Sequence, residues 1–275
     1  MSLQHAYAVT NLLTGLAEGS FSWTPSTTTL RSYLNDGAMD ARFSVVLTAS
    51  TVIVEIDLGS AKNVSAIALL NSNIASATAP TVTIQAADNA GFSVGAVTPK
   101  ATTTLALTPA PLKDHVLQFA AVSKQYWRIT WAWTGSFALT IGELFFASTT
   151  ALTRYVVYGH GRSAEYVNAR LKMYAGGSRA HYIAGPIATR KLPWADLSES
   201  ERNELLVMAE ASKSGATPML WCEQYEAVAT AADAAHQACI FGRIEEDQAS
   251  WTEDDYGIYQ PSALTIRSLG REVGA

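Results

Sequence analysis

The side chains in this sequence best suited to chemistry are two short groups of carboxylates near the C-terminus. They are Glu245, Glu246 and Asp247, followed by Glu253, Asp254 and Asp255. Carboxylate oxygens are the ligands that Ca²⁺ prefers, so these six residues are candidates for holding a calcium ion between two strand ends. Their order lacks the Asp-x-Asp-x-Asp-Gly pattern of a helical calcium loop. We therefore favour a charged, solvated loop over a metal site.

The remaining metal-binding and nucleophilic residue types form no catalytic set. The two cysteines, Cys222 and Cys239, fit no metal spacing; they either pair or stay as buried thiols, and we favour the thiols. No phosphate-binding loop, nucleophile elbow or paired general acid and base is present. Two carboxylates facing a cleft, as glycoside hydrolysis requires, leave no signature in a sequence. We predict no enzymatic activity, no cofactor and no metal. The five histidines show no metal-pair spacing: His5, His115, His160, His181 and His236.

Several aromatic residues are candidates for a different chemistry, the stacking of a ring on a sugar face. Trp23, Tyr33, Trp131 and Trp133 lie in segments with a loop-like composition. The alternative is that these rings pack in a core or at a protein interface, where aromatic residues are also enriched. We assign Trp127 to the core and keep both interpretations for the other four.

Composition points to two folded domains and away from several partners. The chain has 275 residues, 48% hydrophobic and 16% charged, with a net charge of −5. A mildly acidic chain does not favour a nucleic-acid or anionic-membrane partner, and no apolar run approaches the roughly 18 residues that a membrane span needs. Charges are sparse before residue 150 and denser after it. We place a domain boundary there, giving domains 1–148 and 149–275.

The first domain is predicted to be an antiparallel β-sandwich, or jelly roll. Residues 51–58 alternate apolar and polar side chains with the period of two that is typical of a half-buried strand. Residues 81–86 and 126–131 repeat this pattern, and turn-forming clusters such as Asp88–Gly91 separate the strands. Turns that recur every 8–12 residues are typical of sandwiches.

The order of these pieces resembles the discoidin-like (galactose-binding-like) β-sandwich family over roughly residues 8–147. The matching pieces include Asp57-Leu58-Gly59-Ser60, Tyr126-Trp127-Arg128-Ile129 and Ile141-Gly142-Glu143-Leu144-Phe145-Phe146. The resemblance implies an eight-stranded jelly roll whose loops at one end bind sugar, lipid or protein. Many members have a cysteine pair that staples the ends of the sandwich, and this chain lacks it.

The second domain is predicted to be a β-barrel with one flanking helix. Ser198 and Glu201 form a capping box, Leu205 and Met208 belong to an apolar stripe, and Gly215 is placed to end the helix. The helix is therefore expected at about residues 199–213, with strands before and after it.

This layout resembles the tube-forming domain of distal tail and minor tail proteins of long-tailed bacteriophages over roughly residues 152–272. The matching segments are Leu197-Ser198-Glu199-Ser200-Glu201-Arg202, Gly215-Ala216-Thr217-Pro218-Met219-Leu220-Trp221 and Ala263-Leu264-Thr265-Ile266. The resemblance implies a barrel packed into a ring around a channel. In such a ring the six carboxylates near the C-terminus would face the lumen and repel passing DNA.

We therefore expect a structural component of a phage tail tip, located in the virion tail after assembly in the host cytoplasm. Its partners would be copies of itself in a hexameric or trimeric ring, neighbouring tail-tube and tail-tip proteins, and a host-surface glycan, with DNA only as passing cargo. The alternative is a stand-alone carbohydrate-binding module protein of bacterial origin. A third hypothesis is a hydrolase accessory protein.

Overall fold

In the computed structural model most of the described residues lie in strands, and the same residues include one α-helix. The prediction of a mainly β protein is confirmed. The described residues are 5–24, 43–45, 50–105, 115–153, 161–166, 171–173, 179–181, 186–192, 197–212, 217–222, 239–244, 251–253, 259–261 and 264–268.

The chain divides into two compact units, and one of them is built from both ends of the chain. The split unit contains residues 1–9, 151–223 and 240–275, and the other unit, the sandwich, contains residues 10–150 together with 224–239. One boundary between the units lies after Thr150, and the sequence analysis placed its boundary after residue 148. A second boundary, between Val9 and Thr10, was not predicted, and it makes residues 10–150 an insertion in the split unit.

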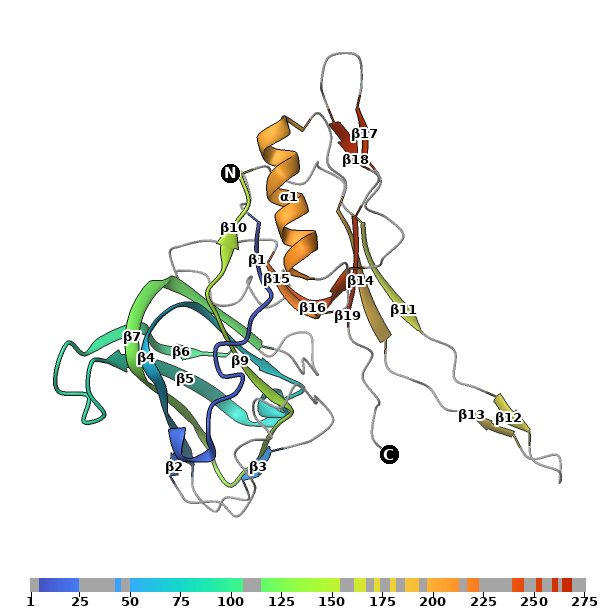
Figure 1. Cartoon of the computed structure of the whole chain (residues 1–275). Coiled ribbons are helices and arrows are strands. Elements are labelled where there is room, and N and C mark those ends of the chain that lie inside the picture. The colour runs from blue at the N-terminus through green and yellow to red at the C-terminus, as the bar shows by residue number, and fades with distance from the viewer. Residues whose placement is uncertain are drawn as a thin grey trace. The chain divides into compact units, whose positions relative to one another are not determined.

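The N-terminal strand shows directly why the first nine residues leave the sandwich. Strand β1 (Ala6–Ala8) pairs antiparallel with β15 (Met219–Cys222), placing Tyr7 opposite Trp221. In Figure 1 the blue β1 lies beside β15, although more than 200 residues separate them in the chain. The predicted domain 1–148 therefore differs from the structure at its start. Cys222, expected to be buried, is fully buried in β15.

The split unit contains a seven-stranded sheet in the order β10-β1-β15-β16-β19-β14-β11. Its outermost described strands are β10 and β11, which are not paired with each other among the residues that the structure describes. Two further ladders, β12-β13 and β17-β18, complete the unit. The strands not yet bounded are β10 (Thr150–Ala151), β11 (Gly161–Tyr166), β12 (Leu171–Met173), β13 (Arg179–His181), β14 (Pro186–Leu192), β16 (Cys239–Ile244), β17 (Trp251–Glu253), β18 (Tyr259–Pro261) and β19 (Leu264–Ser268).

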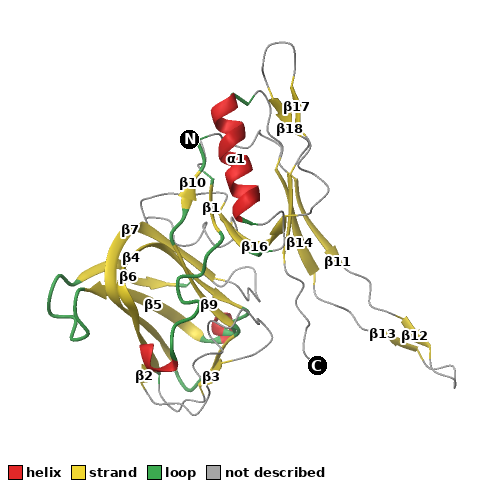
Figure 2. Cartoon of the chain, in the orientation of Figure 1, coloured by secondary structure: helices red, strands yellow, loops and turns green. Residues whose placement is uncertain are grey.

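Helix α1 (Glu199–Ala211) packs on this sheet and begins as predicted (Figure 2). The Ser198 amide donates to the Glu201 carboxylate at 2.8 Å, and the Glu201 amide donates to the Ser198 hydroxyl at 3.4 Å, which completes the capping box. Leu205 and Met208 enter a buried cluster with Tyr7 from β1. Gly215, predicted as the C-terminal cap, lies outside the described residues.

Helix α1 also acts on the titration of Tyr7. Burial of the phenol raises the pKa of Tyr7 above its ordinary value of 10.0, and the negative charge of Glu204 on α1 adds to the rise. The Glu204 carboxylate is held in place by Thr153, whose amide and hydroxyl both donate to it, at 2.9 and 2.6 Å.

A pH prediction follows from the raised pKa of Tyr7. The folded state keeps this proton when the unfolded state has lost it, so the free energy of unfolding falls as pH rises above about 10. Tyr7→Phe has no phenol to ionise, so the variant lacks the part of this decrease that Tyr7 causes. Urea unfolding measures the free energy of unfolding of the wild type and of Tyr7→Phe. The difference between the two values should stay constant up to about pH 9, and above about pH 10 the wild type should lose stability relative to Tyr7→Phe. A difference that does not change across this range would contradict the assignment.

The sandwich consists of eight described strands, β2 to β9. One sheet has the order β2-β4-β7-β5-β6, with β9 pairing on β4, and β3 pairs with β8. The long strands β4 and β7 pair along most of their length, with register shifts after Asp57 and Val64 that let them run through both layers. The bounds are β2 (Phe21–Thr24), β3 (Phe43–Val45), β4 (Thr51–Leu70), β5 (Thr78–Ala87), β6 (Val97–Thr104), β7 (His115–Thr134), β8 (Leu139–Ile141) and β9 (Glu143–Ala147), with short 3₁₀ helices at Glu18–Ser20 and Ile74–Ser76.

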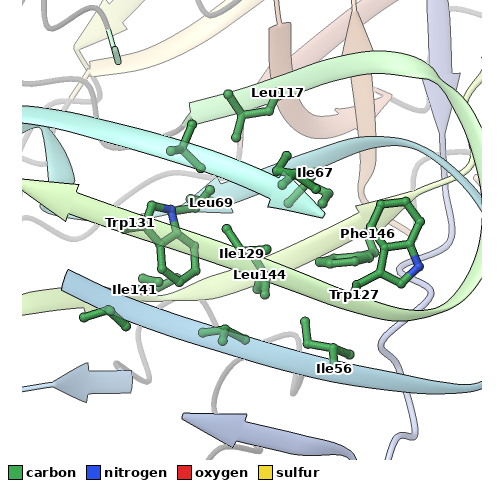
Figure 3. Packing of buried hydrophobic residues seen from close by; sticks show 14 of the residues in the cluster. Ile56, Ile67, Leu69, Leu117, Trp127, Ile129, Trp131, Ile141, Leu144 and Phe146 are labelled. Carbon is green, nitrogen blue, oxygen red and sulfur yellow. The ribbon is translucent and has the colours of Figure 1, made fainter. Parts of the chain in front are cut away.

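The core of the sandwich follows from the alternation seen in the sequence. Ile56 on β4 and Trp127, Ile129 and Trp131 on β7 lie in one buried cluster with Phe146 on β9 (Figure 3). The Trp127 ring meets the Phe146 ring edge-on, with centroids 5.8 Å apart. Trp127 is fully buried, as predicted.

A buried amide joins the two ends of the sandwich. The Asn11 side chain donates to the Glu143 carboxylate at 3.1 Å and to the Leu144 carbonyl at 2.9 Å. Its oxygen accepts from the amides of Leu13 at 3.1 Å and Phe146 at 3.0 Å. Asn11 thus connects the first residues of the sandwich to its last strand, β9.

Candidate binding surfaces

The six carboxylates proposed from the sequence lie almost entirely outside the described residues. Only Glu253 falls in a described element, at the end of β17. Among the residues that the structure describes, no group of three or more His, Cys, Asp or Glu side chains is placed to hold a metal ion. Within the same residues, no helix has the length and apolar character needed to cross a bilayer.

The predicted sugar-stacking tryptophans are gathered together, but inside the sandwich. Trp23, Trp131 and Trp133 are 6%, 0% and 5% exposed, and all three belong to the core. Trp23 stacks on Trp131 with ring centroids 6.3 Å apart, and Trp133 meets Phe137 edge-on at 5.5 Å. Their faces are covered, so they are not a platform for a sugar in this structure. Tyr33 lies outside the described residues.

The strand pattern explains this placement. Trp131 and Trp133 were expected in loop-like sequence, but β7 continues to Thr134. Alternate residues of a strand point to the same face, so both follow Trp127 and Ile129 into the core. The alternation of side chains is visible in the sequence, and it assigns Trp131 and Trp133 to the same face as Trp127.

The indole N–H groups in this core differ in their hydrogen bonding. Trp127 Nε1 donates to the Lys124 carbonyl at 3.1 Å, whereas the buried Nε1 atoms of Trp131 and Trp133 have no hydrogen-bond partner in the described part of the chain. Trp127→Phe therefore loses a hydrogen bond as well as ring volume. Trp131→Phe loses mainly volume, so we expect it to cost about 1 kcal/mol less. Chemical denaturation of the two variants measures this difference, and equal losses would contradict it.

The face of the six-stranded sheet opposite this core is half-exposed and polar along β2, β4, β7 and β5. Across β2, β4, β7 and β5 the register aligns Ser22, Glu55, Arg128 and Gln85 in one row. Ser22 Oγ donates to the Glu55 carboxylate at 3.2 Å, and Arg128 Nε donates to it at 2.8 Å. The Arg128 guanidinium lies 4.0 Å from the centre of the Phe92 ring, as a cation–π pair does.

A row of hydroxyl groups runs beside this charged row. The register aligns Thr24, Ile53, Thr130 and Thr83 across β2, β4, β7 and β5, so the row has three hydroxyls and one apolar side chain. The Thr83 and Thr102 hydroxyls are 2.8 Å apart, which extends the row onto β6. We name the two rows together the outer face. Hydroxyl, carboxylate, amide and guanidinium groups on a flat sheet can exchange hydrogen bonds with a polyhydroxylated ligand. The sequence analysis missed this surface, although its residues are the polar half of the period-two pattern.

The loop between β5 and β6 is pinned beside the outer face. The Asn89 side-chain oxygen accepts from the amides of Ser93 and Val94, both at 3.0 Å, and Lys124 pairs with Asp88 at 2.8 Å. Gly95 has a φ of +57°, a left-handed backbone conformation in which a residue with a side chain would be strained. The loop therefore holds the Phe92 ring against Arg128.

Comparisons with known proteins found similarity among solved structures. No family model and no curated protein matches the chain. One similar solved structure is chitosan-binding module 1 of a chitosanase/glucanase from Paenibacillus sp. IK-5, with 19% identity and a TM-score of 0.40, covering 50% of this chain and 99% of the module. Another is the lectin domain of lectinolysin in complex with Lewis B antigen, with 16% identity and a TM-score of 0.37, covering 50% and 96%.

A third similar structure is a GH29 fucosidase of Ruminococcus gnavus in complex with fucose, with 11% identity and a TM-score of 0.39, covering 51% of this chain and 27% of the enzyme. No tail protein is among the structures named here, and the resemblance of the split unit to tail-tube domains stays a prediction.

Proposed function

We propose that this chain is a self-assembling structural protein that carries a glycan-contacting β-sandwich. More specifically, we propose a distal or minor tail protein of a long-tailed bacteriophage, which forms a ring on the tail tube and presents the sandwich outward. Neighbouring tail-tube and tail-tip proteins would be its other partners, the virion tail its location and DNA its passing cargo. No catalytic step is part of this proposal.

The observation that carries the proposal is the insertion of the sandwich into a second folded unit. β1 and β10, which precede and follow the sandwich, are neighbours in the seven-stranded sheet. The split unit has its own buried cluster, which includes Tyr7 from before the insertion and Leu152 from after it. Binding sugar does not require a second folded unit. The outermost strands of its sheet, however, can pair with a strand of another copy.

The outer face supports the glycan part of the proposal. Its threonine hydroxyls and the Glu55, Arg128 and Gln85 side chains supply donors and acceptors in two parallel rows. Such groups can donate to and accept from the hydroxyls of a saccharide. A surface of this kind selects the ligands that satisfy its hydrogen-bonding groups.

The second candidate is a carbohydrate-binding protein that works alone. Carbohydrate binding is what the names of several similar structures state for those proteins, and none of the three named above is a tail protein. The two candidates share the glycan contact and differ in assembly. A stand-alone binder is a monomer of 29.4 kDa, whereas a ring-former has a mass that is a multiple of that value.

The test combines the mass of the purified chain with glycan-array binding. We expect an assembly that binds a glycan, and we expect Thr83→Arg to weaken that binding at least about tenfold because it covers the hydroxyl row. Ser136→Arg, at an exposed turn of the same unit, is the matched control and should bind normally. A monomer that binds glycan supports the second candidate, and an assembly that binds no glycan removes the glycan part.

A further inference from the structure

An aromatic side chain lies at the surface of the sandwich, beside the outer face. Phe92, in the loop between β5 and β6, is half-buried, whereas the tryptophans predicted to stack on sugar are covered in the core. The Arg128 guanidinium lies 4.0 Å from the centre of the Phe92 ring, which places the ring next to the charged row. Phe92 therefore has the accessible ring surface that the tryptophans lack.

The backbone of Phe92 is in a conformation that bulky residues rarely adopt. Its φ is +52°, in the left-handed region that favours glycine. The Phe92 amide donates to the Asn89 carbonyl at 3.0 Å, and the Asn89 side-chain oxygen accepts from the Val94 amide at 3.0 Å. Strain of this kind persists only where the surrounding structure enforces it, and it is concentrated at ligand sites. The loop thus holds an aromatic ring in one position at a cost in backbone energy.

Polar side chains that can bind a ligand lie around the Arg128 position. Gln85 on β5 is opposite Arg128 in the register, and Tyr126 and Thr130 are two residues before and after it on the same face of β7. All three are half-buried. Their side chains make no hydrogen bond to the residues that the structure describes. Each of them can donate to and accept from a hydroxyl group of a ligand.

The charged groups near the ring are mostly paired with one another. Arg128 Nε donates to the Glu55 carboxylate at 2.8 Å, and Lys124 pairs with Asp88 at 2.8 Å. Asp57 is two residues after Glu55 on the same face of β4 and brings the formal charge of these five groups to −1. Such a surface has no surplus cation for an anionic sugar and weakly repels one. Its charge balance suits an uncharged sugar.

We propose that Phe92 is the stacking ring of a binding site for an uncharged sugar, with Gln85, Tyr126 and Thr130 as its hydrogen-bonding groups. The inference rests on the proposed glycan contact and names its aromatic residue and its class of ligand. The C–H face of the sugar ring packs on Phe92, while its hydroxyl groups bond to the side chains around it. An aromatic surface with a few convergent polar groups is the usual composition of a small-ligand site. Arg128 acts as a positioning residue that holds the ring.

The test is binding of the full chain to an array of neutral glycans built from glucose, galactose and N-acetylglucosamine, together with the sialylated form of each. We expect the sialylated forms to bind about tenfold more weakly than the neutral ones. Phe92→Leu keeps an apolar side chain but removes the ring, so it should weaken binding about tenfold. Phe92→Tyr keeps the ring and should stay within about twofold of the wild type.

Two further variants separate binding from folding. Val94→Ala is the matched control, because the Val94 side chain is 58% exposed in the same loop and is not part of the proposed site, and it should bind normally. Tyr126→Phe removes one hydroxyl group and leaves the ring in place, so we expect a folded protein that binds about fivefold more weakly. Chemical denaturation of each variant checks that the sandwich is intact.

The outcomes distinguish this site from the function on which it rests. If the wild type binds glycan and both Phe92→Leu and Tyr126→Phe bind as tightly, the site is wrong while the glycan contact stands. Equal losses in Phe92→Leu and Phe92→Tyr would overturn the stacking role, and a preference for sialylated glycans would overturn the class of ligand. A wild type that binds no glycan removes the glycan contact and this site with it.

Discussion

Replacing residues 10–149 with a short turn leaves the split unit folded and able to assemble, and it abolishes glycan binding. The reason is topological. β1 and β10 are adjacent in the sheet, and the Leu152 amide donates to the His5 carbonyl at 2.8 Å. The chain therefore leaves the split unit and returns to it at neighbouring points, which a turn of two to four residues can bridge.

The excision changes mass and binding in separate ways. The number of copies in the assembly should stay the same while the mass of each copy falls by that of the sandwich. Light scattering and glycan-array binding measure the two effects. The matched fragment is residues 10–150, whose buried cluster lies within the sandwich, and we expect it to be a folded monomer. An excised chain that aggregates or unfolds would show that the split unit depends on the sandwich.

Asn11→Ala is expected to cost the sandwich about 3–5 kcal/mol of unfolding free energy. The substitution removes four hydrogen bonds in a buried site and leaves two backbone amides, a carbonyl and the Glu143 carboxylate without the partner they had. Buried polar groups that lose their partner are expensive because water does not replace it.

Asn73→Ala is the control for this effect. Asn73 also bridges two segments, donating to the Ala138 carbonyl at 2.8 Å and accepting from the Thr140 amide at 2.7 Å, but it is only partly buried. It makes two bonds where Asn11 makes four, and water can reach them, so we expect a loss of about 1 kcal/mol. Chemical denaturation, with hydrogen exchange of the β9 amides reporting on the sandwich, compares the two. A smaller loss for Asn11→Ala than for Asn73→Ala would contradict the role of Asn11.

Part of the candidate surface could be predicted from the sequence, and part of the prediction was wrong for a physical reason. The alternation in residues 126–131 predicts both the core side chains and the polar ones, so Glu55 and Arg128 could have been assigned to one face. The composition around Trp133 predicted a loop, but the alternation of side chains along β7 predicts the buried position that the structure shows. The row formed with Ser22 and Gln85 depends on the register of separate strands, which no local pattern contains.

From the sequence by itself came the mainly β class and the start of α1 at its capping box. These features depend on periodicity and on contacts between residues a few positions apart. Tertiary structure alone decided that Ala6–Ala8 joins β15 and that Asn11 fastens the first residues of the sandwich to β9. Each of these depends on which distant strand a short segment meets. A three-residue strand or a single asparagine has too little local pattern to choose that partner.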